Sequence, residues 1–248
     1  MTPSHRTSAL LLLGLPVACW VWVIAMARDM YGPMTGSAAW MMMATWDGPY
    51  LLLLWAMWAA MMAAMMLPSA TPLVMLSARA ASRSADARHA AGRLYALVGS
   101  YLSIWCVFSL GATMLQWWLA TSGLLTPMME PSARPAAACL LLVAGVYQFT
   151  PFKQACLRSC RTPLAMLTAR WRPGFVGAAQ MGATHGAYCL GCCWALMLLL
   201  FAGGVMNLAV VIALAVWVAL EKLAPFGEQS ARIGGALLLA AAGWMFLG

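Results

Sequence analysis

Apolar residues in this chain form long runs, and nearly all charged residues lie in the short segments between them. A helical run of about 20 apolar residues spans the roughly 30 Å of hydrocarbon in a bilayer. The pattern predicts an all-α fold, a polytopic transmembrane bundle of about seven spans that forms a single integral membrane domain over residues 1–248. The predicted spans, of which the fourth and the last are short, are Ala9–Ala27, Tyr50–Leu67, Leu94–Leu119, Ala136–Thr150, Gly174–Ala202, Val205–Leu220 and Ile233–Leu247.

Basic residues are divided unevenly between the two sides of this bundle. Short loops rich in Lys and Arg stay on the cytoplasmic side of a membrane. If the N-terminus lies inside, all but two of the 14 Lys and Arg residues are cytoplasmic. We therefore expect the N-terminus in and the C-terminus out. The residues assigned to the cytoplasm are Arg6, Arg79, Arg83, Arg88, Arg93, Lys153, Arg158, Arg161, Arg170, Arg172, Lys222 and Arg232, and those assigned outside are Arg28 and Arg134.

Two cytoplasmic segments follow from this topology. The first is a basic linker at about residues 78–93, rich in Ala and Arg. It is either a plain topology signal or a helix that lies on anionic lipid headgroups. The second is a loop at about residues 151–173 that contains Cys156 and Cys160, which could capture a metal or remain simple thiols in a reducing compartment.

Composition excludes several classes of protein. Hydrophobic residues make up 64% of the chain and charged residues 8%, whereas about a quarter of a soluble protein is charged. The formal charge of +8 is spread between apolar runs and is not interleaved with aromatic residues, so no nucleic-acid partner is expected. The sequence contains no phosphate-binding Gly-x4-Gly-Lys-Ser/Thr loop, which argues against a nucleotide-driven pump. The first run is long for a cleaved signal and contains Trp20 and Trp22, which favours an uncleaved span.

The fifth run contains a cluster of metal-ligand types in the stretch THGAYCLGCCW. On a helix, His185, Cys189 and Cys192 fall within an arc of roughly 60°, and Cys193 lies beside them. Thiolates and imidazole are the donors that select copper(I), zinc or iron. The cluster predicts an intramembrane metal site, with copper as the first candidate and zinc or iron as alternatives. Ordinary packing of the thiols, with the imidazole bonded to a neighbouring helix, is the competing interpretation.

Glycines bracket this cluster in a run that is longer than the hydrocarbon thickness. Gly182, Gly186 and Gly191 could let the helix unwind at a ligand site, or let another backbone approach closely.

A methionine-rich second span offers further soft donors. Met57, Met61 and Met65 share one helical stripe, and Met62 and Met66 share an adjacent stripe. Thioethers suit copper(I), although methionine also fills apolar interfaces well.

Two acidic residues complete the candidates. Glu221 could support an imidazole or carry a proton, or could form a simple ion pair with Lys222 at the end of the sixth span. Asp47 is either a cation entry site or the N-cap of the second span. The predicted topology places the His/Cys cluster, Met66 and Glu221 towards the cytoplasmic half, which suggests a single site.

These motifs together resemble an uncharacterised bacterial family described as predicted metal-binding integral membrane proteins. The resemblance covers about Asp47 to Trp244 and implies a bacterial cytoplasmic membrane as the location. It implies His185, Cys189, Cys192 and Cys193 as ligands, with Cys156, Cys160 and the methionine-rich helix as secondary candidates, and it names no substrate. The motifs are W-D-x-x-Y, A-M-M-L-P-S-x-x-P, Q-x-x-P-x-K-x-x-C-L-x-x-C, T-H-G-x-Y-C-x-G-C-C-W and E-K-x-x-P.

The favoured function is therefore storage, delivery or translocation of copper(I), with the lipid bilayer and a metal chaperone or membrane-complex subunit as expected partners. A membrane thiol oxidoreductase that uses Cys189, Cys192 and Cys193 is the enzymatic alternative, and a structural subunit of a membrane complex is the third. We assign no catalytic residue and favour a non-enzymatic role. Only His185 could serve a hydrolase as a base, and it has no acidic residue nearby in sequence.

Overall fold

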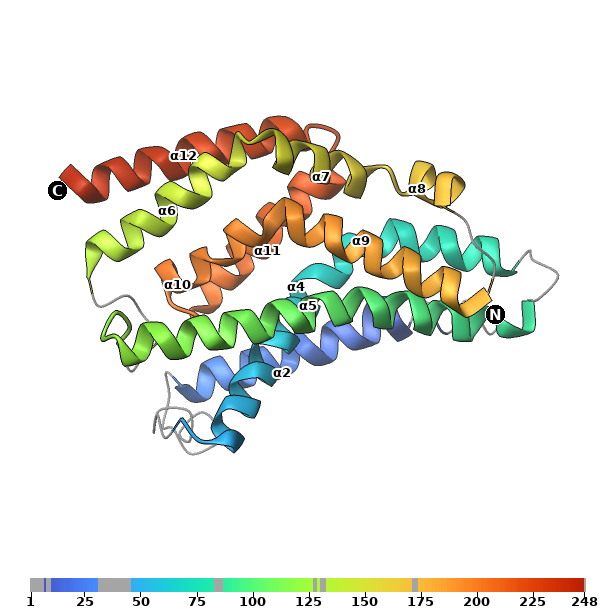
Figure 1. Cartoon of the computed structure of the whole chain (residues 1–248), viewed down its shortest axis with the longest axis horizontal. Helices are drawn as coiled ribbons and strands as arrows, with labels where there is room; N and C mark the ends of the chain where they lie inside the picture. The colour runs from blue at the N-terminus through green and yellow to red at the C-terminus, as the bar shows by residue number, and fades with distance from the viewer. Residues whose placement is uncertain are drawn as a thin grey trace.

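The computed structural model describes residue 7, residues 10–30, 46–82 and 87–126, residue 129, and residues 133–170 and 174–247. The elements in these residues are all helices, which confirms the all-α prediction for this part of the chain (Figure 1). They are η1 (Leu10–Gly14), α2 (Leu15–Met30), α4 (Gly48–Ser82), η2 (Ala87–His89), α5 (Ala90–Thr121), α6 (Arg134–Gln148), α7 (Pro151–Arg161), α8 (Pro163–Arg170), α9 (Gly174–Met197), α10 (Leu199–Gly203), α11 (Leu208–Leu223) and α12 (Gly227–Leu247).

Five helical segments of the described residues are long and apolar enough to cross a membrane, and the number rises to six if the bent pair α6–α7 counts as one span. This is compatible with a membrane protein. The count of seven and the orientation remain predictions, since α11 is shorter than a typical span. The predicted span start Ala9 and the topology residues Arg6, Arg83 and Arg172 lie outside the described residues.

The prediction of a loop at 151–173 is wrong for most of this segment, because the chain folds there into α7 and α8. After α6, the chain bends by 66° and α7 begins. Thr150 caps α7 by accepting a hydrogen bond from the Lys153 amide, and Pro151 occupies its first turn. A proline in the first turn is compatible with a helix start. Cys156 and Cys160 are therefore buried within the bundle instead of lying in an aqueous loop.

The described residues of the basic linker form no long helix of their own, and η2 is the short helix among them. Helix α4 continues through Pro68 and Pro72 to Ser82, and α5 begins at Ala90, so the linker mainly extends two bundle helices. Interior prolines are tolerated where neighbouring groups bond the backbone that they disturb. The Ser69 hydroxyl donates to the Met66 carbonyl at 2.8 Å in this segment.

Helix α9 runs without interruption through all three glycines that bracket the cysteines, and the break comes after Met197. Of the two interpretations that the sequence left open, unwinding is therefore wrong and close packing is confirmed. A Cβ atom at Gly186 would lie 3.0 Å from Ile104 Cγ1 and 3.2 Å from the Tyr101 carbonyl oxygen, and one at Gly182 would overlap the backbone of Leu97. These glycines let α9 lie directly against α5.

Helix α5 packs between α4 and α9, α12 packs along α6, and α7 packs on α9 (Figure 1). Large apolar side chains point outward, as shown by exposed fractions of 70% for Val107 and 80% for Trp244. Polar side chains such as Gln116 and Lys153 are buried. This inside-out distribution is typical of a bundle that contacts lipid.

Candidate metal centre

Five helices converge on the cysteines of α9. Cys189, Cys192 and Cys193 are buried, with exposed fractions of at most 1%. Helix α4 contributes Met66, α5 contributes Tyr101, α7 contributes Cys160 and α11 contributes Lys222. We call these seven side chains, together with His185 of α9, the sulfur cluster.

The ammonium group of Lys222 lies among three sulfur atoms. Its Nζ donates to Cys189 Sγ at 2.8 Å, to Cys193 Sγ at 3.6 Å and to Met66 Sδ at 3.7 Å. The side chain is only 6% exposed. A buried ammonium requires compensating partners, and a positive charge beside a thiol favours the thiolate. Cys189 is therefore the natural anionic partner of Lys222.

The remaining thiols are held by short contacts. Cys192 and Cys193 both donate to the Cys189 carbonyl oxygen, at 3.1 and 3.0 Å. Cys192 Sγ lies 4.0 Å from Cys160 Sγ, and Cys193 Sγ lies 4.0 Å from Met66 Sδ. All are free thiols. The cluster therefore has two sides, with Cys192 facing α7 while Cys193 faces α4.

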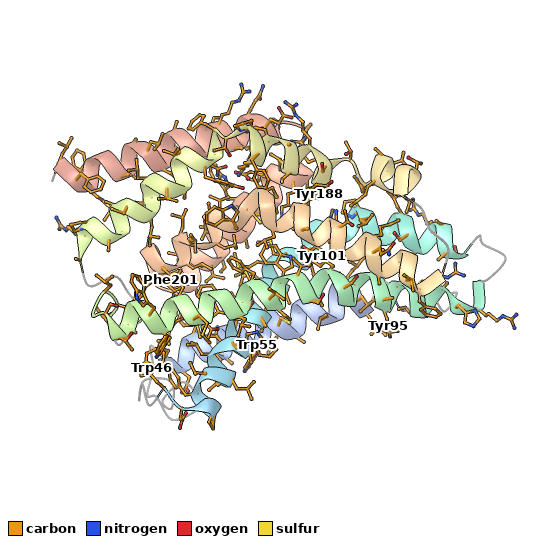
Figure 2. The ribbon with its side chains drawn as sticks, viewed as in Figure 1. Trp46, Trp55, Tyr95, Tyr101, Tyr188 and Phe201 are labelled. Atoms are coloured by element: carbon orange, nitrogen blue, oxygen red, sulfur yellow. The ribbon has the colours of Figure 1, made fainter. Side chains whose placement is uncertain are left out.

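Tyr101 and His185 form the α5 side of the cluster. Figure 2 labels Tyr101 inside the bundle. Its hydroxyl donates to the Met66 carbonyl oxygen at 3.0 Å and lies 3.1 Å from Cys189 Sγ. The Tyr101 and His185 rings lie tilted against each other with their centroids 5.8 Å apart. His185 is 3% exposed, and its Nδ1 has no hydrogen-bond partner among the described residues. A buried nitrogen without a partner is costly, so this imidazole is available to a ligand.

Glu221 belongs to a separate ion pair beside the cluster. Its carboxylate accepts from Lys153 Nζ at 2.7 Å, from Trp217 Nε1 at 2.8 Å and from Gln148 Nε2 at 3.1 Å. Both charged groups are at most 1% exposed. Among the described residues the Glu221 carboxylate pairs with neither Lys222 nor His185, so the simple ion pair with Lys222 and the support of an imidazole are not what the structure shows. Its role as a proton carrier stays a prediction.

Comparison with known families gives an independent indication of the role of this chain. A family model described as "PpoB2: Copper chaperone" matches residues 55–245, which is more than half of the chain. The chain belongs to the PpoB2 copper chaperone family. Membership supports a copper-handling role. No curated protein and no solved structure matches the chain.

A copper chaperone needs soft ligands, and the sulfur cluster supplies thiols, a thioether and an imidazole. No group of three or more His, Cys, Asp or Glu side chains within the described ranges is already arranged to hold a metal ion. The centre of the sulfur atoms is instead taken by Lys222. A metal ion at this centre would therefore require the Lys222 side chain to move.

The predicted site residues separate into two groups. His185, Cys189, Cys192, Cys193 and Cys160 come together, and Cys156 packs with its Sγ against Gly191 of α9. Met57, Met61 and Met65 are buried in the core, but none hydrogen-bonds to a cysteine among the described residues. Asp47 is the N-cap of α4, since its Oδ1 accepts from the Tyr50 amide at 2.9 Å.

Sequence reasoning missed Tyr101 and the contact of Lys222 with sulfur, whereas it placed Met66 at the depth of the His/Cys cluster. Lys222 was interpreted as a topology signal because it follows an apolar run. The adjacent Glu221–Lys222 pair is a signal that could have revealed the role of Lys222. Neighbouring side chains on a helix point about 100° apart, so at a buried helix end the two charged groups need separate partners inside the bundle.

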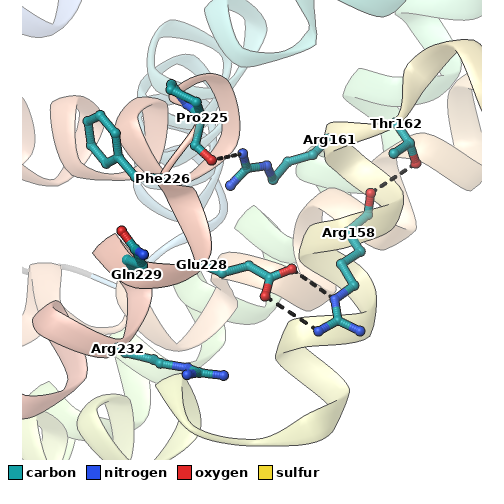
Figure 3. Close-up of a pocket in the computed structure, with 8 residues that line it drawn as sticks. All are labelled: Arg158, Arg161, Thr162, Pro225, Phe226, Glu228, Gln229 and Arg232. Carbon is teal, nitrogen blue, oxygen red and sulfur yellow. Dashed lines mark hydrogen bonds and ion pairs between the residues drawn. The ribbon is translucent and has the colours of Figure 1, made fainter.

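A surface pocket of about 680 Å³ lies where α7 meets the α11–α12 connection (Figure 3). Arg161 crosses from α7 and donates to the carbonyl oxygens of Ala224 at 2.7 Å and Pro225 at 2.9 Å, and more weakly to that of Glu221 at 3.4 Å. The last carbonyls of a helix lack intrahelical partners. Arg161 therefore fixes the end of α11 that carries Lys222.

Proposed function

We propose that this chain is an integral membrane protein that binds copper(I) as cargo at the sulfur cluster and passes it to an acceptor. Cys189 and Cys193 supply thiolates next to the thioether of Met66, and Cys192 with Cys160 supplies a second pair of thiols on the α7 side. His185 offers a free nitrogen. The observation that carries the proposal is that three sulfur atoms from two helices already surround a cation, the Lys222 ammonium.

The donor set favours copper(I) over other metals. Thiolate and thioether sulfur select copper(I), whereas zinc sites seldom use thioethers. Family membership independently supports copper handling.

The thiol oxidoreductase alternative lacks comparable support. Reactive cysteines occupy partly exposed positions, and these thiols are at most 1% exposed apart from Cys160 at 8%. A copper ion can migrate between buried sulfur ligands, whereas a protein substrate cannot reach them without opening the bundle.

The test is the copper content of detergent-purified protein produced with copper, zinc and iron supplied. We expect about one copper per chain, and loss of copper in Cys189→Ser/Cys192→Ser. Cys139→Ser is the matched control, because Cys139 is an exposed free thiol and should leave copper content unchanged. Metal-free wild-type protein, or equal copper in all three proteins, would reject the proposal.

The topology that we propose has seven crossings of a bacterial cytoplasmic membrane, with the N-terminus inside and α11 as one crossing. The uneven distribution of Lys and Arg supports it. Reporter fusions after Ser82 and Gly203 would test it, since we expect the first junction in the cytoplasm and the second outside.

A further inference from the structure

The environment of Lys222 suggests a role beyond holding helices together. Its ammonium group makes all three of its described contacts to sulfur, on Cys189, Cys193 and Met66. The nearest carboxylate in sequence, Glu221, is engaged by Lys153. The positive charge of Lys222 is therefore assigned to the thiols and not to an acidic side chain.

The three sulfur atoms around Lys222 can carry at most two negative charges, because the thioether of Met66 is neutral. Cys193 donates its thiol proton to the Cys189 carbonyl oxygen and must release that proton to solvent when a metal binds. The two thiolates then balance one ammonium and one monovalent cation. A divalent cation in the same place leaves one positive charge that these three sulfur atoms cannot balance. Uncompensated charge in a membrane bundle is costly, so the lysine penalises divalent ions more than monovalent ones.

We propose that Lys222 is the specificity-determining residue of the copper site and that it restricts the site to soft monovalent cations. Its ammonium group holds the sulfur atoms together before copper arrives. The long, flexible side chain then withdraws from the centre of the cluster while its charge stays close enough to balance the second thiolate. This inference rests on the proposed function, because it concerns the same cluster.

The experiment compares metal uptake by wild-type protein, Lys222→Gln and Lys222→Arg. Copper(I) and silver(I) are the monovalent probes, and zinc(II) and cadmium(II) are the divalent ones. Bound metal is measured by elemental analysis after desalting, with cadmium–thiolate absorption as a second readout. Arg232→Gln is the charge-matched control, since it removes a positive charge exposed at the surface.

We expect wild-type protein and Lys222→Arg to bind copper(I) and silver(I) and to exclude cadmium(II). In Lys222→Gln the preference for copper(I) over cadmium(II) should fall by about tenfold or more, because one charge is removed within a few ångströms of the metal. Arg232→Gln should behave as wild type.

A compensating variant supplies an internal check. Cys193→Ser removes one thiolate and should weaken copper(I) binding, and adding Lys222→Gln should restore part of it, since one thiolate then balances copper(I) alone. Additive losses in the double variant would overturn the inference.

Wild-type data decide the matter even if Lys222→Gln fails to fold. Equal uptake of cadmium(II) and copper(I) by wild-type protein, or unchanged selectivity in a folded Lys222→Gln, overturns the role of Lys222 and leaves the copper function intact. Absence of copper(I) and silver(I) from wild-type protein overturns the proposed function itself.

Discussion

Replacing Gly182 by alanine should separate α9 from α5 and weaken the bundle. A Cβ atom there would lie 2.8 Å from the carbonyl carbon of Leu97, and closer still to that carbonyl oxygen and to the Ser100 hydroxyl. The backbone carbonyl cannot rotate away, so α9 must move outward. Overpacking of this kind costs about 1–3 kcal/mol.

The matched control is Gly99→Ala on α5, where nothing lies within 4 Å of the added Cβ. Both substitutions replace a mid-helix glycine, so the gain in helix propensity of about 1 kcal/mol is common to both and cancels in the comparison. The difference between the variants therefore isolates the packing cost. A difference of about 2 kcal/mol corresponds to roughly 4–8 °C in Tm for a chain of this size.

Thermal unfolding in detergent, followed by circular dichroism, measures this difference. We expect Gly182→Ala to melt below Gly99→Ala and to bind copper(I) more weakly, because the 3.1 Å contact between Tyr101 and Cys189 depends on the spacing of the same two helices. Equal melting temperatures would refute the reasoning that α9 needs a glycine for contact with α5.

Two other substitutions test the cluster and the ion pair beside it. Met66→Leu should lower copper(I) affinity at least about tenfold, measured by competition with a chromogenic copper(I) chelator. Met57→Leu is the control and should leave the affinity unchanged. Both substitutions keep the core volume, so each should lower the free energy of unfolding by less than about 1.5 kcal/mol. Glu221→Gln should cost about 3–5 kcal/mol in detergent unfolding by leaving Lys153 buried without a negative partner. Arg158→Gln, at an exposed ion pair, should change stability little, and an equal loss in both variants would contradict this account.

The helical fold and the location of the site follow from local patterns. Run length and hydropathy identify the long helices, and the 3.6-residue period places His185, Cys189 and Cys192 on one face, which the structure buries. The Asp47 cap and the close packing at Gly182 were among the interpretations that the sequence allowed. These features depend on residues near one another in the chain.

The parts that were missed depend on contacts between distant residues. Cys160 reaches Cys192 only because α7 turns back into the bundle after the 66° bend. A polar segment with two basic residues in its last turn gives no local sign of burial. The helical period places Met65 and Met66 on adjacent stripes, but it cannot tell which of the two stripes faces α9.

The two charged residues at the end of α11 explain how Lys222 comes to point at sulfur. Adjacent side chains on a helix diverge by about 100°, so Glu221 and Lys222 face different neighbours. Glu221 is bound by Lys153 of α7 and Gln148 of α6, which fixes the rotation of α11 about its axis. Arg161 binds the carbonyls at the end of the same helix and limits its sliding. The α6–α7 pair therefore sets both the rotation of α11 and its position along its own axis. Lys222 is left facing α9 and α4, where its charge has no described partner except the sulfur atoms of the cluster.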